Sequence, residues 1–190
     1  MVPMPSPART VWLLRHAKTV RDPPPGGSDF DRILAPRGQR DARALGRLFT
    51  GKADALGLPR SVPLPTVALV SSSARTAATA DLVLAGLTDP PECRLERALY
   101  GASPDEVIDH LRALEDDVRA AMVVGHNPTA FELSQGLIES SDKKGLALVN
   151  QRGFPTCALG IYRFRIEQWR EVSTKGAKLV ELMTPPYDEK

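Results

Sequence analysis

Residues 10–18 read T-V-W-L-L-R-H-A-K, an apolar run followed directly by basic residues. Its apolar run, residues 11–14, is short and unbroken, as in a strand buried on both faces of an α/β sheet. Arg15 and His16 follow at once, at the carboxyl end of the predicted strand, where open α/β sheets bind their ligands. We therefore expect this strand to deliver a cation and an imidazole to a binding site.

Length and composition are those of one globular domain. The 190 residues are 42% hydrophobic and 25% charged, with a formal net charge of +2, so nothing indicates a nucleic-acid partner. Cys93 and Cys157 form no C-x-x-C pair and are expected to be reduced, and we expect no membrane span or secretion signal. We predict one cytoplasmic domain over residues 1–190, a monomer or weak dimer with flexible tails at 1–8 and 184–190.

Strands and helices alternate along the rest of the chain. Strands are predicted at 66–70 and 120–124, with an edge strand at 94–99 and an antiparallel pair at 156–166 and 169–173. Helices are predicted from Pro36 to Gly51 and over 74–86, the second with Ser72 or Ser73 as its N-cap. Two more helices are predicted, one from Ser103 onward and one that follows an Asn127 cap and ends at about Ile138. Loops are predicted at 19–35 and 140–145. This order predicts a three-layer α/β/α sandwich with a mostly parallel central sheet and an antiparallel edge.

Basic side chains follow three of the predicted strands. Arg15 and His16 come after the first strand, Arg75 after the second, and His126 directly after residues 120–124. Arg75 falls in the first turn of a helix, where its charge opposes the helix dipole and a bound anion would remove the conflict. Arginine binds phosphate oxygens bidentately, and a neutral histidine can act as nucleophile or proton carrier. The sequence therefore predicts a phosphoryl site at this edge of the sheet.

Three segments resemble the signatures of a known family: L-L-R-H-A-K-T, S-S-S-A-R-T-A-A-T-A and V-V-G-H-N-P-T. In this order they look like those of the histidine phosphatase superfamily, with its phosphoglycerate mutase-like fold. D-F-D-R-I-L-A-P-R-G is similar to the small SixA-type phosphohistidine phosphatases. The resemblance implies that His16 attacks phosphorus and becomes a covalent phosphohistidine, without metal or other cofactor. It also implies phosphate contacts from Arg15, Arg32, Arg75 and His126.

Further side chains near these motifs are candidate substrate contacts. Thr19 could donate a hydrogen bond to the phosphoryl group, and Asn127 stands directly after His126. The charged loop over 19–35 contains Asp29, Asp31 and Arg32, and we expect it to fold back over the site. The neighbouring guanidinium groups should disfavour the charged form of His16 and so keep the nucleophile available.

The residues leave the substrate open. Many members of this family that act on phosphate monoesters carry a carboxylate shortly before a Y-G or F-G pair, which protonates the leaving alcohol. Glu96 stands one position earlier than that pattern requires, so it is either a general acid or a surface glutamate. A site without a strong acid favours phosphohistidine, whose protonated imidazole leaves readily. We expect a protein phosphohistidine phosphatase; the alternatives are a phosphomonoesterase for a small metabolite, with Glu96 as acid, and a non-catalytic phosphate-binding regulatory module.

Overall fold

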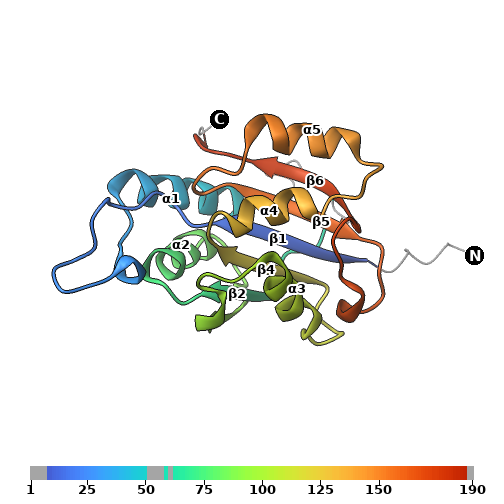
Figure 1. Ribbon diagram of the computed structural model, residues 1–190, viewed down its shortest axis with the longest axis horizontal. Helices are drawn as coiled ribbons and strands as arrows, with labels where there is room; N and C mark the ends of the chain where they lie inside the picture. The colour runs from blue at the N-terminus through green and yellow to red at the C-terminus, as the bar shows by residue number, and fades with distance from the viewer. Residues whose placement is uncertain (1–7, 51–57, 60–61, 188–190) are drawn as a thin grey trace, which may run out of the picture.

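The computed structural model describes residues 8–50, 58–59 and 62–187, and within them six strands form one sheet in the order β3-β2-β4-β1-β5-β6 (Figure 1). In chain order the strands are β1 (Arg9–Arg15), β2 (Val67–Ser71), β3 (Glu92–Glu96), β4 (Ala120–Gly125), β5 (Leu159–Phe164) and β6 (Ala177–Met183). The apolar run over residues 11–14 therefore lies in an inner strand, β1, flanked by β4 and β5.

Helices connect the strands and cover the sheet. In the described part of the chain they are α1 (Pro36–Thr50), α2 (Ala74–Leu84), α3 (Pro104–Arg112), α4 (Thr129–Gly136) and α5 (Lys143–Arg152), with short 3-10 helices η1 (Asp29–Asp31), η3 (Arg97–Leu99) and η4 (Trp169–Glu171). Strands β1, β2, β3 and β4 are parallel, because α1, α2 and α3 provide the crossovers that parallel pairing needs. Strands β5 and β6 pair antiparallel at one edge, which confirms the predicted mixed sheet.

The apolar residues of β1 contribute to two separate cores. Val11 and Leu13 pack with side chains of α3, α4 and α5, whereas Trp12 and Leu14 pack with side chains of α1 and α2. All four are at most 1% exposed, so each contributes about 1.5–3 kcal/mol to folding. The unbroken apolar run is therefore explained by helices on both faces, and the predicted three-layer sandwich is confirmed (Figure 1).

Helix α1 starts directly against the segment that follows β1. A Cβ atom on Gly38 would lie 2.0 Å from the carbonyl oxygen of Lys18, and one on Gly86 would lie 1.9 Å from that of Gly46. No side chain fits at either place, because real Cβ contacts are much longer. These glycines bring the backbone of α1 close to the segment after His16 and to the end of α2.

The predicted strand at 169–173 is wrong. Its first three residues form η4, and the strand that pairs with β5 at the sheet edge is β6, further along the chain. Trp169 is fully buried, and its indole Nε1 donates to the carbonyl oxygen of Val118 at 2.7 Å. The buried Trp169 ring thus holds this segment against the core although the segment forms no strand. The edge strand β6 was missed because Lys178 and Glu181 interrupt its apolar pattern.

The predicted loop over 140–145 is also partly wrong, because α5 begins at Lys143. Asp142 caps this helix by accepting a hydrogen bond from the Gly145 backbone N–H at 3.0 Å. Only Gly145 and Val149 of α5 are buried, so the helix has little apolar periodicity to reveal it.

The predicted helix starts and ends agree in part. Ser103 caps α3 as expected, in a reciprocal capping box with Glu106. Ser73 holds the N-cap position of α2, but its hydroxyl lies 2.7 Å from that of Thr76 and caps no backbone group. The predicted edge strand starts and ends earlier, as β3, and its last residues form η3.

Parts of both predicted tails, residues 1–7 and 188–190, lie outside the described residues, as does the predicted helix end at Gly51. In the described part of the second tail, the Tyr187 ring packs against the α1–α2 side of the core, and its hydroxyl donates to the carbonyl oxygen of Cys157. Among the helices that the structure describes, none has the length and apolar character needed to cross a bilayer.

Candidate active site

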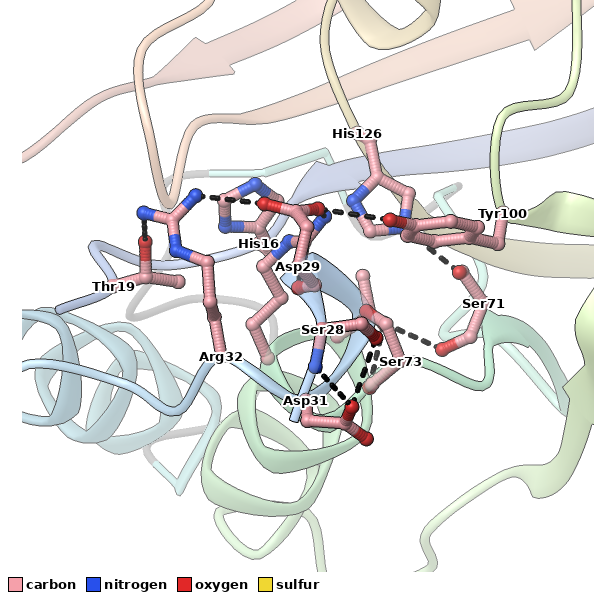
Figure 2. Close-up of polar contacts among 12 residues, drawn as sticks. His16, Thr19, Ser28, Asp29, Asp31, Arg32, Ser71, Ser73, Tyr100 and His126 are labelled. Atoms are coloured by element: carbon pink, nitrogen blue, oxygen red, sulfur yellow. Dashed lines mark hydrogen bonds and ion pairs between the residues drawn. The ribbon is translucent and has the colours of Figure 1, made fainter. Parts of the chain in front are cut away.

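The carboxyl ends of β1, β4 and β2 meet at one edge of the sheet. Arg15 pairs with Gly125 in the β1–β4 register, and Val70 pairs with Val124 in the β2–β4 register. The next backbone N–H along the chain, that of His16, donates to the Gly125 carbonyl oxygen at 3.0 Å. This register brings the two strand-end histidines together: the ring centroids of His16 and His126 lie 5.3 Å apart (Figure 2).

Hydrogen bonds orient His16 as a nucleophile would require. Its carbonyl oxygen accepts from the Cys157 backbone N–H at 3.0 Å, and the next N–H, of Ala17, donates to Thr79 Oγ1 at 3.0 Å. The ring Nδ1 lies 2.8 Å from the Ala17 carbonyl oxygen. A carbonyl oxygen can only accept, so Nδ1 carries the proton and Nε2 keeps its lone pair.

The environment of His16 keeps its ring neutral. Burial lowers its pKa from 6.5 to about 3, and the charges of His126, Arg75 and Arg15 act in the same direction. The expected direction of the pKa shift is confirmed, although burial is a larger cause than the guanidinium groups. The lone pair on Nε2 is therefore available at neutral pH.

His126 is held by the end of the neighbouring strand and packs against an aromatic ring. Its Nε2 lies 2.8 Å from Ser71 Oγ, while its buried Nδ1 has no hydrogen-bond partner among the described residues. Burial, with a smaller effect of Arg75, lowers its pKa to about 4. The Tyr100 ring packs edge-on at 5.4 Å between centroids. A neutral imidazole with a free buried nitrogen can bond to an oxygen that enters the site.

Arg75 lies in the first turn of α2, as predicted, and is only 6% exposed. Its Nη1 donates to the carbonyl oxygen of Asp29 at 2.5 Å, and its Nη2 donates to the Asp29 carboxylate at 2.9 Å. The anion expected near this helix start is therefore supplied, in this structure, by a carboxylate of the chain itself.

The loop over 19–35 folds back over the site as expected, and Arg32 and Thr19 hold part of it there. The Arg32 Nη2 donates to Thr19 Oγ1 at 2.7 Å, and its Nη1 donates to the Asp29 carboxylate at 3.0 Å. The hydroxyl of Thr19 thus accepts a hydrogen bond that orients Arg32 and keeps its own proton for another partner.

Arg15 and Asn127 meet on a common acceptor. Arg15 Nη1 and Asn127 Nδ2 donate to the carbonyl oxygen of Phe154 at 2.9 and 3.3 Å. The prediction that Asn127 caps α4 is wrong, because α4 begins at Thr129 and the N-cap position falls on Pro128. Asn127 instead ties the end of β4 to the segment before β5.

Glu96 ends β3, opposite Ser71 in the parallel register. No hydrogen bond or ion pair joins its carboxylate to His16 or His126 in the part of the chain that the structure describes. Its role as a general acid stays a prediction.

Three residues join this constellation that the motifs did not single out for it. Asp29 receives hydrogen bonds from Arg32, Arg75 and Tyr100, the last from its hydroxyl at 2.8 Å (Figure 2). The hydrogen bonds from Arg32 and then Tyr100, with the charge of Arg75, lower the Asp29 pKa to about 2. Ser71, at the end of β2, bonds to His126. The position of Ser71 at a strand end was a usable signal, whereas nothing local distinguished Asp29 from Asp31.

Comparisons with known proteins place this geometry in a family, although no family model matches the chain. An uncharacterised Mycobacterium tuberculosis protein, Rv1276c, is 33% identical over 174 residues, which cover 90% of this chain and 99% of the relative. A candidate phosphohistidine phosphatase SixA from Nakamurella multipartitia is 28% identical, with a TM-score of 0.73 over 96% of this chain and 99% of its own. One from Agrobacterium tumefaciens is 25% identical, with a TM-score of 0.70 over 93% and 98%.

The chain belongs to the histidine phosphatase superfamily. This confirms the resemblance carried by the three sequence segments, the phosphoglycerate mutase-like fold and the assignment to the phosphatases. As a histidine phosphatase, the chain brings the segments around His16, Arg75 and His126 to one edge of its sheet.

Proposed function

We propose that this histidine phosphatase hydrolyses phosphohistidine on a protein, through a covalent phosphohistidine at Nε2 of His16. The observation that carries the proposal is the state of that ring. Its Nδ1 proton is committed to the Ala17 carbonyl oxygen, and burial with three nearby basic groups keeps the ring neutral. A neutral imidazole fixed in one tautomer beside cationic guanidinium groups is suited to attack an anionic phosphoryl group.

The proposed reaction has two steps. First, the Nε2 lone pair of His16 forms a bond to phosphorus while the bond from phosphorus to the substrate nitrogen breaks, and the substrate imidazole leaves with one proton. Water then attacks the phosphorus on His16, which releases inorganic phosphate and restores the ring. Arg15, Arg32 and Arg75 stabilise the negative charge on the phosphoryl oxygens. The free Nδ1 of His126 contacts one of these oxygens.

The leaving group argues for phosphohistidine. An imidazole that is already protonated leaves without an acid from the enzyme, whereas an alcohol leaving group needs one. Glu96 makes no hydrogen bond or ion pair with either site histidine among the described residues, and burial leaves both rings neutral at pH 7. The two SixA-type neighbours support the same substrate class.

A trapping experiment tests the proposal. The protein is mixed with a ³²P-phosphohistidine-bearing protein or with ³²P-labelled metabolites, quenched at early times, and mapped for label by mass spectrometry. We expect label on His16 from the phosphohistidine protein, and none in a His16→Asn variant. A His110→Asn variant is the matched control and should label normally, because His110 lies in the last turn of α3 and no hydrogen bond or ring contact of the described residues joins it to His16 or His126.

The other outcomes reject separate parts of the proposal. Label on His16 from metabolites alone would reject the substrate class and favour the phosphomonoesterase. Absence of label together with absence of aryl phosphate hydrolysis would reject the enzyme and favour a phosphate-binding module.

A further inference from the structure

Asp29 occupies the groups that the proposed function assigns to the substrate. Its carboxylate accepts from Arg75 Nη2 at 2.9 Å and from Arg32 Nη1 at 3.0 Å, and its carbonyl oxygen accepts from Arg75 Nη1 at 2.5 Å. Both terminal nitrogens of Arg75 are thus bonded to one residue. Charge-assisted contacts of this kind are among the stronger hydrogen bonds in proteins.

The contact lies inside the site. The hydroxyl of Tyr100 donates to the same carboxylate at 2.8 Å, and the Tyr100 ring packs against His126 at 5.4 Å. Figure 2 shows Asp29 between the side chains of Arg32 and Tyr100. The negative charge of Asp29 also acts to raise the pKa of His126, against the larger lowering by burial.

A second set of contacts holds the same loop down. The ring of Phe30, next to Asp29, packs edge-on against Tyr100 at 5.0 Å between centroids. The Arg97 guanidinium carbon lies 3.9 Å from the Phe30 ring centroid, a cation–π contact. Asp29 and Phe30 therefore attach the loop to Arg97 of η3 and to Tyr100, which follows η3.

We infer that Asp29 is an internal ligand of the phosphate site, which competes with the substrate phosphoryl group and must be displaced before Arg75 and Arg32 can bind it fully. The inference rests on the proposed function, because it takes those guanidinium groups as the phosphate contacts. A carboxylate on the same chain has a high effective concentration at the site. A phosphoryl dianion displaces it because the anion carries more charge and more acceptor oxygens, whereas a monoanion such as acetate does not.

Competition and simple positioning predict opposite results. If Asp29 competes, its removal frees the guanidinium groups and removes a negative charge that repels the incoming anion, so phosphate binds more tightly. If Asp29 only orients Arg32 and Arg75, its removal disorders them and phosphate binds more weakly. The sign of the change in affinity therefore decides between the two roles.

The experiment measures the dissociation constant of inorganic phosphate by isothermal titration calorimetry, at fixed pH and ionic strength. We expect Asp29→Asn to bind phosphate about tenfold more tightly than the wild type. The reason is that the variant loses the state in which the Asp29 carboxylate occupies Arg75 and Arg32, and that state lowers the apparent affinity for phosphate. Asp29→Ser, which also removes the charge, should shift the constant in the same direction. Asp22→Asn is the matched control, since Asp22 is an exposed carboxylate of the same loop, and it should leave the constant within about twofold.

Wild-type hydrolysis of an aryl phosphate, measured in parallel, separates the inference from the proposed function. An unchanged or weaker phosphate affinity in both Asp29 variants, with wild-type turnover intact, overturns the inference and leaves the proposed function standing. Absence of both phosphate binding and turnover in the wild type overturns both.

Discussion

Two regions face each other across the candidate active site and are held in different ways. The strand-end cluster (Arg15, His16, Ser71, Arg75 and His126) lies at the carboxyl ends of β1, β2 and β4 and in the first turn of α2. The register of these strands and the bond from His16 N–H to the Gly125 carbonyl oxygen fix its position. The cover loop (residues 19–35) is held over the site by side chains, chiefly Asp29 on Arg75 and Phe30 on Tyr100.

The difference teaches how the site can be both precise and accessible. Moving the strand-end cluster would break backbone bonds of the sheet, whereas releasing the cover loop breaks only exchangeable side-chain contacts. The two ends of the loop are joined by backbone hydrogen bonds, from Val20 N–H to the Ile33 carbonyl oxygen and from Ala35 N–H to the Lys18 carbonyl oxygen. The chemistry is therefore assigned to the rigid region and the access of substrate to the adjustable one.

The largest expected effect breaks the strand-end cluster. His16→Ala should lower kcat for an aryl phosphate by about 10⁴-fold or more, because the proposed covalent step has no other nucleophile. Steady-state kinetics measures this, with His110→Ala as a control that keeps full activity. Persistent turnover in the His16 variant would disprove the covalent mechanism.

The buried imidazole of His16 should also make stability depend on pH. Its pKa is about 3 in the folded protein and 6.5 when exposed, so the unfolded chain binds more protons between these values. The free energy of unfolding is therefore fully retained above pH 6.5 and falls as the pH drops toward 3. The slope contributed by this ring is up to about 1.4 kcal/mol per pH unit. Urea unfolding from pH 7 to pH 4 measures it, and a His16→Asn variant with an equally steep dependence would contradict the assignment.

The two regions should differ in their tolerance of an arginine-to-lysine change. Arg75→Lys should lower kcat/KM by about 100-fold, because a buried lysine cannot replace two directed guanidinium bonds. Arg32→Lys, in the cover loop, should lower it by about tenfold, because Arg32 is more exposed and moves with the loop. Equal losses, or a larger loss at Arg32, would remove the distinction between the regions.

The contact between α1 and the segment after His16 can be tested through stability. Gly38→Ala should lower the free energy of unfolding by about 1–3 kcal/mol, because its methyl group would meet the Lys18 carbonyl oxygen. Gly136→Ala is the control: a Cβ there meets nothing within 4 Å, so stability should hold or rise slightly. Thermal unfolding of the two variants distinguishes them, and equal melting temperatures would show that α1 yields at this point.

The smallest effect is expected at Glu96. Glu96→Gln should leave kcat/KM for a phosphohistidine peptide within about twofold, because the proposed leaving group needs no enzyme acid. A loss of more than about tenfold at neutral pH would make Glu96 the general acid and move the substrate toward phosphate monoesters.

Much of the fold could be predicted because its signals are local. The apolar run over 11–14 predicts a strand buried on both faces, and Pro104 behind Ser103 predicts the start of α3. The last strand was misplaced because polar residues on the edge strand β6 hide its alternation, and α5 was missed because few of its side chains are buried. An element that buries few of its side chains shows little apolar periodicity, so its sequence gives little indication of a strand or a helix.

By itself, the sequence determined which residues reach the site from the strands, because the carboxyl ends of parallel strands must meet at one edge. It also determined that His16 stands among cations. Only the tertiary structure decided what those cations hold, since Asp29 meets Arg75 across 46 residues and Tyr100 across 71. Such contacts depend on how a loop packs onto a finished sheet, and no local spacing encodes that.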